Sequence, residues 1–239
     1  LRLTLRGSAH GRVSLLIEGG RGTGRPADLL EAVSSLDAIW HRAGASSPEH
    51  LAGAPGLPET WGDETFEVGG TAFLQVNREA AELLEAHVLS LVGNVAGKTV
   101  VDAYCGIGLH GRRLARAGAR VEGIELDPHA VRAAEAAGVL GLTVHEGTVE
   151  ALLPRFLPAD LLILNPPRAG MAAEIAEAIT ARPPERIICI SCDPATLARD
   201  LKRLASRFRL DAVRCFDLFP QTAHVETVAS LSRIPEPAT

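Results

Sequence analysis

The chain has 239 residues and a formal net charge of −5, with 46% hydrophobic and 22% charged residues. This length can bury a core of useful size and fits one domain of ordinary length plus a smaller one. The acidic balance argues against a purely electrostatic nucleic-acid binder. The lack of an apolar run near roughly 20 residues and of a charged leader leads us to expect a cytoplasmic protein without a membrane segment.

The first 76 residues are predicted to form a small mixed α/β domain. Residues 1–6 and 13–17 are typical of strands joined by a glycine-containing turn. Residues 26–36 have helical spacing of their apolar side chains, Leu29, Leu30, Val33 and Leu36. Residues 43–58 are rich in Gly, Ala, Ser and Pro, so we expect an exposed loop there.

A hairpin and a connecting helix are expected next. Residues 65–68 and 72–76 flank the pair Gly69-Gly70, which favours a hairpin turn. Asn77 is a good N-cap for a connecting helix over residues 77–94. The apolar residues expected on one side of this helix are Ala80, Leu83, Leu84, Val88 and Leu91.

Residues 95–239 alternate short apolar strands with helices, which predicts the larger domain. The expected strands are 99–103, 120–125, 142–145, 161–164 and 186–191, and the expected helices lie near 108–117, 128–138, 148–153, 171–181 and 195–206. This order indicates an α/β fold with a doubly wound, Rossmann-like parallel sheet and right-handed crossovers. Strands near 210–216 and 226–232 follow each other without a helix, so we expect an antiparallel edge pair.

The stretch Ile187-Ile188-Cys189-Ile190-Ser191-Cys192-Asp193-Pro194 predicts a buried strand that hands a thiol to a helix start. Cys192 would then lie at the carboxyl end of a strand, where open α/β sheets bind ligands. It can be a nucleophile or merely a small buried residue. Side chains three apart on a strand point to opposite faces, so we do not expect Cys189 and Cys192 to form a redox pair or a metal site.

A glycine loop follows the first strand of the larger domain. Gly106, Gly108 and Gly111 form G-x-G-x-x-G, and glycines here let the backbone approach a ligand at a helix N-terminus. Glu125 ends the next strand, where it can accept hydrogen bonds from a ribose. Nicotinamide dinucleotides and S-adenosylmethionine both carry that ribose. Asp102 before the glycines favours the cationic sulfonium donor.

Five motifs in register resemble the RNA uracil-5 methyltransferases. They are Phe73-Leu74-Gln75-Val76-Asn77, Asp102-Ala103-Tyr104-Cys105-Gly106-Ile107-Gly108, Asn165-Pro166-Pro167-Arg168-Ala169-Gly170, Ser191-Cys192-Asp193-Pro194-Ala195-Thr196-Leu197-Ala198-Arg199-Asp200 and His224-Val225-Glu226. The family makes 5-methyluridine in ribosomal or transfer RNA from S-adenosylmethionine. The resemblance implies a class I methyltransferase domain over residues 95–239, preceded by the family's small central domain.

The resemblance also implies roles for single residues. Cys192 would be the nucleophile and Glu226 the base, with His224 as a positioning neighbour. The residues that would contact S-adenosylmethionine are Gln75, Tyr104, Gly106, Glu125, Thr148 and Asn165. We expect an RNA substrate, ribosomal rather than transfer RNA, a monomer, and no metal. Many relatives carry four cysteines for an iron-sulfur cluster and an N-terminal RNA-binding barrel, and neither is visible in this chain.

Two alternatives stay open. Asn165 stands where the family commonly has Asp, and Asn-Pro-Pro also resembles methyltransferases that modify exocyclic amines. A non-catalytic RNA-binding relative is the main alternative that is not an enzyme. If RNA docks here, a stripe of basic residues at helical spacing is expected to contact it, consisting of Arg199, Lys202, Arg203 and Arg207.

Overall fold

The computed structural model describes residues 1–8, 10–22, 24–44, 46–61, 64–69 and 77–235. The chain separates into two compact units, residues 1–74 and residues 75–239. The helix that follows Asn77 belongs to the second unit. Each unit is therefore described by itself.

The first unit is built from two small sheets and one short helix. Its elements are β1 (Arg2–Gly7), β2 (Val13–Glu18), α1 (Pro26–Ala32), β3 (Leu36–Arg42), β4 (Glu49–Gly53), β5 (Gly56–Trp61) and β6 (Glu64–Gly69). Strands β1 to β4 form one sheet in chain order, and β5 pairs with β6. Leu15, Leu36 and Ile39 form one buried cluster, and Ala38, Trp40 and Leu57 form another.

The predicted helix over 26–36 is too long. Helix α1 ends at Ala32 and buries no residue, and Val33 remains 39% exposed. Leu36 instead begins β3, where it is buried beside Ile39. Pairing of β3 with β2 gives Leu36 both sheet hydrogen bonds and a core position, and this tertiary gain outweighs its helical spacing.

The loop predicted over 43–58 is also wrong, because it contains β4 and the start of β5. Gly53 has a φ of 85°, and a Cβ there would collide with the backbone oxygen of Asp37 on β3. The glycine thus permits close pairing of two strands rather than marking a loop. The predicted hairpin partner of residues 65–68, residues 72–76, lies outside the described residues, and β6 pairs with β5.

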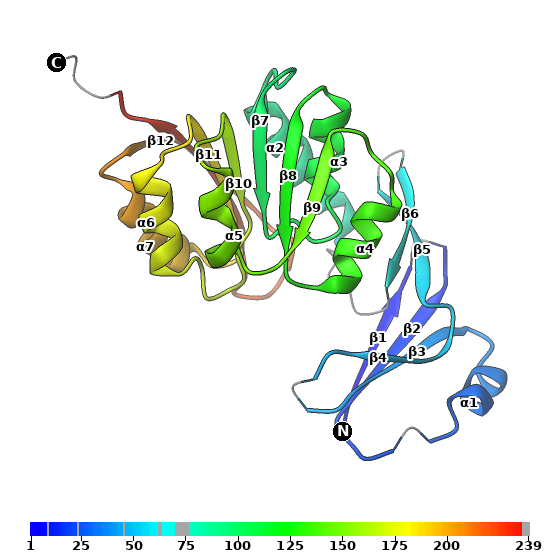
Figure 1. Cartoon of the computed structure of the whole chain (residues 1–239). Coiled ribbons are helices and arrows are strands. Elements are labelled where there is room, and N and C mark those ends of the chain that lie inside the picture. Colours follow the sequence, from blue (N-terminus) through cyan, green and yellow to red (C-terminus); the bar gives the residue numbers. More distant parts are fainter. Residues whose placement is uncertain (9, 23, 45, 62–63, 70–76, 236–239) are drawn as a thin grey trace. The chain divides into compact units, whose positions relative to one another are not determined.

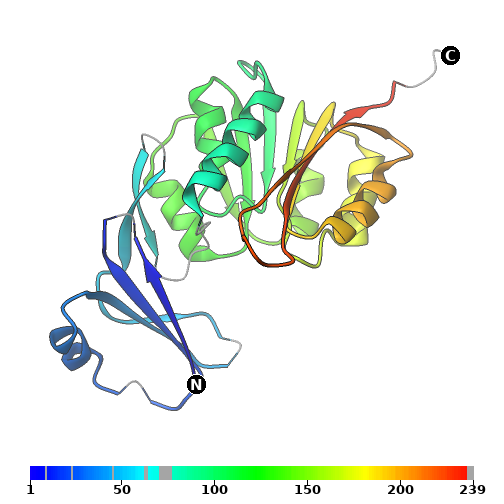
Figure 2. The same ribbon diagram turned by 180° about the vertical axis from the view of Figure 1, so that it is seen from behind.

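The second unit is a seven-stranded sheet covered by helices on both faces. Its helices are α2 (Arg78–Val92), α3 (Leu109–Arg116), α4 (Pro128–Ala136), α5 (Val149–Phe156), α6 (Ala173–Ala181) and α7 (Pro194–Leu204). Its strands are β7 (Thr99–Ala103), β8 (Arg120–Glu125), β9 (Leu142–Glu146), β10 (Leu161–Leu164), β11 (Arg186–Ser191), β12 (Phe208–Phe216) and β13 (Glu226–Arg233). Figures 1 and 2 show α5, α6 and α7 on one face of the sheet and α2 and α3 on the other.

The strand order confirms the predicted fold class. The sheet runs β12-β13-β11-β10-β7-β8-β9. Strands β7 to β11 pair in parallel, and β13 is antiparallel to both β11 and β12. The main core lies between the sheet and α5, α6 and α7, with Leu153, Leu162 and Ile179 fully buried. Parallel strands bring their carboxyl ends to one edge, which is where the loops that carry the predicted site residues begin.

Helix α2 begins as predicted, and its buried face includes the predicted Leu84 and Val88 but is shifted from the predicted one. The Asn77 side chain accepts a hydrogen bond from the backbone N–H of Ala80 at 3.2 Å, which caps the helix. Leu83, expected on the buried side, is 62% exposed. The buried residues are Ala81, Leu84, Glu85, Val88 and Val92. A charged residue lies within the buried stripe, and its partners on α3 explain why.

A cluster of ionisable side chains joins α2, β7 and α3. Glu85 pairs with His110 Nδ1 at 2.7 Å and with Arg113 Nη1 at 3.3 Å. The carboxylate of Asp102 is fully buried and accepts the backbone N–H of Gly111 at 3.1 Å. Burial raises the pKa of Asp102 to about 6. Burial lowers the pKa of His110, but the charge and the hydrogen bond of Glu85, together with the charge of Asp102, outweigh burial and raise this pKa to about 9. The cluster thus holds a charged histidine in the first turn of α3, immediately after the glycine loop.

The described part of the chain contains neither a candidate membrane helix nor a candidate metal-binding cluster. No helix there is both long and apolar enough to cross a membrane. No three His, Cys, Asp or Glu side chains gather there in a way that could hold a metal ion.

We predict that His110 makes the stability of the second unit fall as the pH rises from neutrality. Folding raises the pKa of His110 from 6.5 to about 9. Its contribution is therefore complete below pH 6.5 and disappears as the pH rises through about 9. By linkage the loss is on the order of 3 kcal/mol. Urea denaturation at a series of pH values, followed by helical circular dichroism, measures it, because α2 to α7 all lie in this unit.

His110→Gln should flatten this dependence on pH. His87→Gln is the matched control, because burial lowers the pKa of His87 and it therefore titrates below the window. An equal slope in the unmodified chain and in His110→Gln would show that the Glu85–His110 pair is not the cause.

Candidate functional site

The turn between β11 and α7 holds Cys192 as the sequence predicts. Asp193 Oδ1 accepts the backbone N–H of Thr196 at 2.8 Å, and Pro194 is the first residue of α7. The backbone N–H of Asp193 donates to the Ser191 hydroxyl at 3.2 Å, and that hydroxyl donates to the Asp193 carbonyl at 3.1 Å. Cys192 therefore lies in a tight turn braced on both sides, with its thiol half-buried.

Glu226 lies beside Cys192 across the sheet. Thr227 of β13 is in register with Ser191 of β11, so the next positions along the two antiparallel strands are Glu226 and Cys192. Glu226 is 5% exposed. Burial raises the pKa of Cys192, and the negative charge of Glu226 raises it further. The structure thus brings the predicted nucleophile and base together.

Arg168 is the third member of this group, and sequence reasoning gave it no role. Its positive charge and a hydrogen bond from its guanidinium lower the pKa of the Cys192 thiol, against the effects of burial and Glu226. Arg168 comes from the loop after β10, and Cys192 from the end of β11. The sequence motif Asn-Pro-Pro-Arg contains this arginine, but only the fold shows that its guanidinium acts on the Cys192 thiol.

Cys189 and Cys192 have different surroundings. Cys189 is buried in the main core, and burial followed by the charge of Asp200 raises its pKa to about 12. Cys192 faces the loop edge instead. All four cysteines are free thiols. The absence of a redox pair or a shared metal site at these two positions stays a prediction.

The glycine loop is braced by Glu125 at the end of β8. Glu125 Oε2 accepts the backbone N–H of Gly106 at 2.8 Å. Its Oε1 accepts the backbone N–H groups of Leu126 at 2.7 Å and Asp127 at 2.8 Å. Gly106 has a φ of 56°, and the position of a Cβ there meets no atom within 4 Å. The loop therefore presents open space with a carboxylate beside it, which suits the hydroxyl groups of a ribose.

Asp102 does not have the role that its position suggested. Its side chain is 1% exposed and bonded to the backbone of Gly111, so it braces the start of α3. Direct contact with a cationic ligand would need a surface carboxylate. Glu125 is the acidic residue that reaches the loop.

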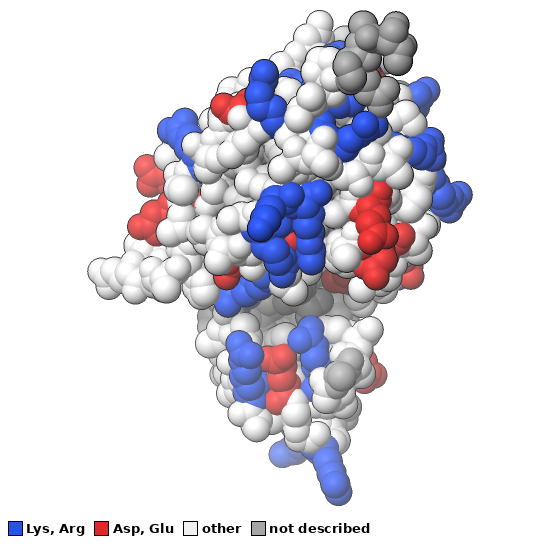
Figure 3. Space-filling view, turned by 90° about the vertical axis from the view of Figure 1, so that its left-hand side faces the viewer, with Lys and Arg blue, Asp and Glu red and all other residues white. Residues whose placement is uncertain are grey.

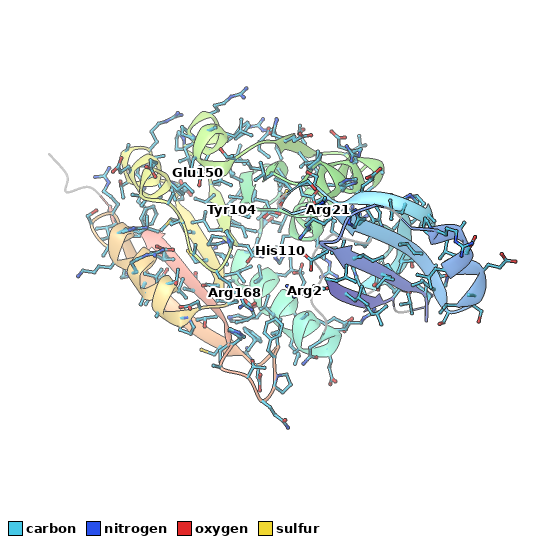
Figure 4. All side chains as sticks on the ribbon, turned by 90° about the horizontal axis from the view of Figure 1, so that it is seen from below. Arg2, Arg21, Tyr104, His110, Glu150 and Arg168 are labelled. Carbon is cyan, nitrogen blue, oxygen red and sulfur yellow. The ribbon has the colours of Figure 1, made fainter. Side chains whose placement is uncertain are left out.

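Tyr104 lies between the glycine loop and the main core. It has a left-handed backbone with a φ of 63°, which is uncommon for a residue with a side chain. Burial, and then the charges of Glu150 and Asp200, raises its pKa to about 12. In Figure 4 Tyr104 is labelled between Glu150 and Arg168. Its phenol therefore remains protonated at neutral pH and is available as a hydrogen-bond donor.

The remaining predicted cofactor residues follow neighbouring strands. Thr148 caps α5, where its hydroxyl oxygen accepts the backbone N–H of Ala151 at 3.3 Å. Asn165 is exposed after β10, and its backbone N–H donates to the Ala103 carbonyl at 3.3 Å. Gln75 lies outside the described residues. The Asn165 side chain is thus available at the edge that also carries the glycine loop and Cys192.

The predicted basic stripe on α7 is partly engaged within the protein. Arg199 and Arg203 both donate to the carboxylate of Asp200, at 2.8 Å and 3.2 Å. Figure 3 views the side on which α6, α7 and β12 lie, and it shows both basic and acidic patches there. On this face the second unit is not uniformly basic. Docking of RNA on the stripe stays a prediction.

Comparison with known proteins agrees with this geometry. A family model described as tRNA (Uracil-5-)-methyltransferase matches residues 153–234. A protein of Gloeobacter violaceus described as an uncharacterized RNA methyltransferase is 44% identical over 188 residues, covering 77% of this chain and 41% of the relative. One of Enterococcus faecalis, described in the same words, is 35% identical over 192 residues, covering 77% and 42%.

A solved structure supports the same relationship. The Pyrococcus abyssi tRNA (uracil-54, C5)-methyltransferase, in complex with S-adenosyl-L-homocysteine, matches with a TM-score of 0.76 at 26% identity and covers 96% of this chain and 59% of that one. The chain spans about two fifths of the length of the curated relatives named above. The matched family model, these relatives and the shared fold together support assignment of the chain to the RNA uracil-5-methyltransferase family.

Proposed function

We propose that the protein transfers a methyl group from S-adenosylmethionine to C5 of a uridine in RNA, with Cys192 as nucleophile and Glu226 as base. The observation that carries the proposal is the convergence of Cys192, Glu226 and Arg168 at one edge of the sheet. The names of the relatives and of the family model support the substrate and the methyl donor.

The residues beside the glycine loop fit the methyl donor. Gly106 leaves open space, Glu125 offers carboxylate oxygens to a ribose, and Tyr104 offers a phenol. Thr148, Asn165 and Gln75 remain proposed contacts. When bound, S-adenosylmethionine supplies an electrophilic methyl group on a sulfonium.

The chemistry of uracil explains why a thiol and a carboxylate are needed together. C5 of uracil is too poor a nucleophile to accept a methyl group unaided. Addition of the Cys192 thiolate at C6 breaks the C5–C6 double bond and moves the electron pair through C5 to the C4 carbonyl oxygen, which makes C5 nucleophilic. The product of methylation at C5 still carries the C5 proton.

Glu226 completes the reaction. Its carboxylate takes the C5 proton, the electron pair re-forms the C5–C6 double bond, and the Cys192 thiolate leaves C6. A buried carboxylate without a bound proton is required for this role, and its negative charge opposes ionisation of the thiol beside it. The arrangement therefore needs a positive group to sustain the thiolate.

Arg168 is that group in the proposal. The N-terminus of α7 favours the thiolate by only about 0.3 to 1 kcal/mol, which is less than one pKa unit. Burial and Glu226 act in the opposite direction. The guanidinium of Arg168 is the cation that lowers the pKa of Cys192, so we assign it the role of stabilising the attacking thiolate.

The proposal also concerns which class of RNA, ribosomal or transfer RNA, is the substrate. Ribosomal RNA is the expectation from the sequence resemblance, and the solved Pyrococcus abyssi relative is named for transfer RNA. Mapping 5-methyluridine in both RNA classes from a deletion strain and its parent separates the two.

We predict that the chain binds S-adenosylmethionine and that Glu125→Gln weakens this binding by roughly 10- to 100-fold, because hydrogen bonds to a charged group contribute about 1.5 to 3 kcal/mol. Isothermal titration calorimetry measures the affinity. Glu174→Gln, an exposed carboxylate on α6, is the control and should bind as tightly as the unmodified chain. Binding of NADH together with no binding of S-adenosylmethionine or S-adenosylhomocysteine would rule out the proposed cofactor.

We predict that the two proposed catalytic residues fail differently. Cys192→Ala should form no covalent complex with RNA, because no thiol is left to add at C6. Glu226→Gln should add the thiol and accept the methyl group but stall before elimination, which accumulates a protein–RNA adduct. Denaturing gels with radiolabelled RNA measure the adduct.

RNA that contains 5-fluorouridine should trap the unmodified chain, because its fluorine cannot be removed as a proton. Cys215→Ser is the matched control, since this thiol is exposed on β12. Methyl transfer by Cys192→Ala without any adduct would instead support the exocyclic-amine chemistry.

A further inference from the structure

The loop that carries Asn165 and Arg168 packs directly against α7. Gly170 in this loop has a φ of 77°. A Cβ at this position would collide with the side chains of Thr196, Arg199 and Asp200. Only glycine permits such a close approach with this backbone conformation. The loop and the helix therefore have a fixed separation.

A buried carboxylate on α7 holds the far end of the loop. Asp200 is 4% exposed, and its Oδ2 accepts the backbone N–H of Met171 at 2.9 Å. Its Oδ1 accepts Arg199 Nε at 2.9 Å and Arg203 Nη1 at 3.2 Å. The carboxylate is thus saturated by charge-assisted hydrogen bonds, which compensates for its burial.

The same two arginines reach back to the loop. Arg199 Nη2 donates to the Ala169 carbonyl at 2.8 Å, and Arg203 Nη1 donates to the Met171 carbonyl at 2.8 Å. Each guanidinium therefore bridges the Asp200 carboxylate and a loop carbonyl. The backbone is held at 169 and 171, immediately after Arg168.

Helix α7 begins two residues after Cys192, so one helix fixes both the thiol and the loop that carries Arg168. We propose that Asp200, Arg199 and Arg203 are positioning residues that clamp residues 165–171 to α7. The clamp holds the Arg168 guanidinium at the Cys192 thiol. The proposal rests on the proposed function only in taking Cys192 as the nucleophile.

The direction in which the pKa of Cys192 shifts in Asp200→Asn distinguishes the proposed clamp from a direct effect of the Asp200 charge. The charged groups that act on Cys192 are Glu226 from β13 and Arg168 from the loop. Asp200 instead acts on Tyr104 and Cys189. If Asp200 influenced the Cys192 thiol only through its negative charge, Asp200→Asn would lower the pKa of that thiol. Release of Arg168 would raise it.

The test measures alkylation of Cys192 by iodoacetamide as a function of pH, in the full chain without RNA or methyl donor. Peptide mass spectrometry with fragment ions separates Cys192 from Cys189, and the exposed Cys215 is an internal reference. Arg168→Met should raise the midpoint of the Cys192 profile. Asp200→Asn should raise it too, and an upward shift of half a unit reduces the alkylation rate at neutral pH about threefold.

The double variant decides whether the two effects share one cause. Asp200→Asn combined with Arg168→Met should shift the midpoint no further than Arg168→Met alone, because the clamp acts through that arginine. Lys202→Met on the same helix should leave the profile unchanged, since its exposed side chain makes no hydrogen bond or ion pair with any described residue.

A lowered or unchanged midpoint in Asp200→Asn overturns the proposal, as does full additivity with Arg168→Met. If Asp200→Asn fails to fold, Arg203→Met decides by the same criteria, because the Arg203 side chain is 35% exposed and its loss leaves Arg199 on the carboxylate. If the unmodified chain does not methylate RNA but Asp200→Asn and Arg168→Met still act non-additively on the Cys192 profile, the proposed function is refuted and the clamp stands.

Discussion

Helix α7 is the element on which the site depends. One carboxylate caps its first turn, and a second one, on the helix itself, binds a neighbouring loop. At the start, Asp193 caps the helix through Thr196 and thereby defines the turn that holds Cys192. About two helical turns further on, Asp200 binds the loop after β10 through Met171. Asp193 thus positions the turn after β11, and Asp200 positions the loop after β10.

The surroundings of the Cys192 thiol disfavour its ionisation. Burial and the nearby Glu226 both favour the neutral form of Cys192, and Arg168 opposes them. A negatively charged Glu226 therefore opposes formation of the Cys192 thiolate, and Arg168 offsets part of that effect.

The glycine loop depends on a second set of buried charges. Glu85 lies in the buried face of α2 because His110 and Arg113 of α3 meet its carboxylate. Burying these groups singly would cost several kcal/mol each, whereas the pairing retains their charge. The result ties α2 and α3 to the end of β7, and the loop between β7 and α3 is held at its base by Asp102 and at its rim by Glu125.

The sequence by itself determined the features that depend on neighbours within a few residues. Alternating strands and helices over residues 99–206, the caps at Asn77 and Asp193, and the glycine loop all follow from local spacing and side-chain chemistry. These features were enough to predict the parallel sheet and the antiparallel edge pair, whereas the pairing of Cys192 with Glu226 was implied by the resemblance to the family. Their physical basis is that capping bonds and hydrophobic periodicity act within one or two turns.

Only the tertiary structure decided the features that need distant partners. Leu36 joins a strand because β2 is available to pair with it, and residues 49–53 form β4 because β3 lies beside them. Arg203 bonds to a loop 32 residues away, so its helical spacing indicated a surface stripe rather than a clamp. Arg168 meets Cys192 for the same reason. Hydrogen bonds and ion pairs between segments depend on strand order and register, and no local pattern contains that information.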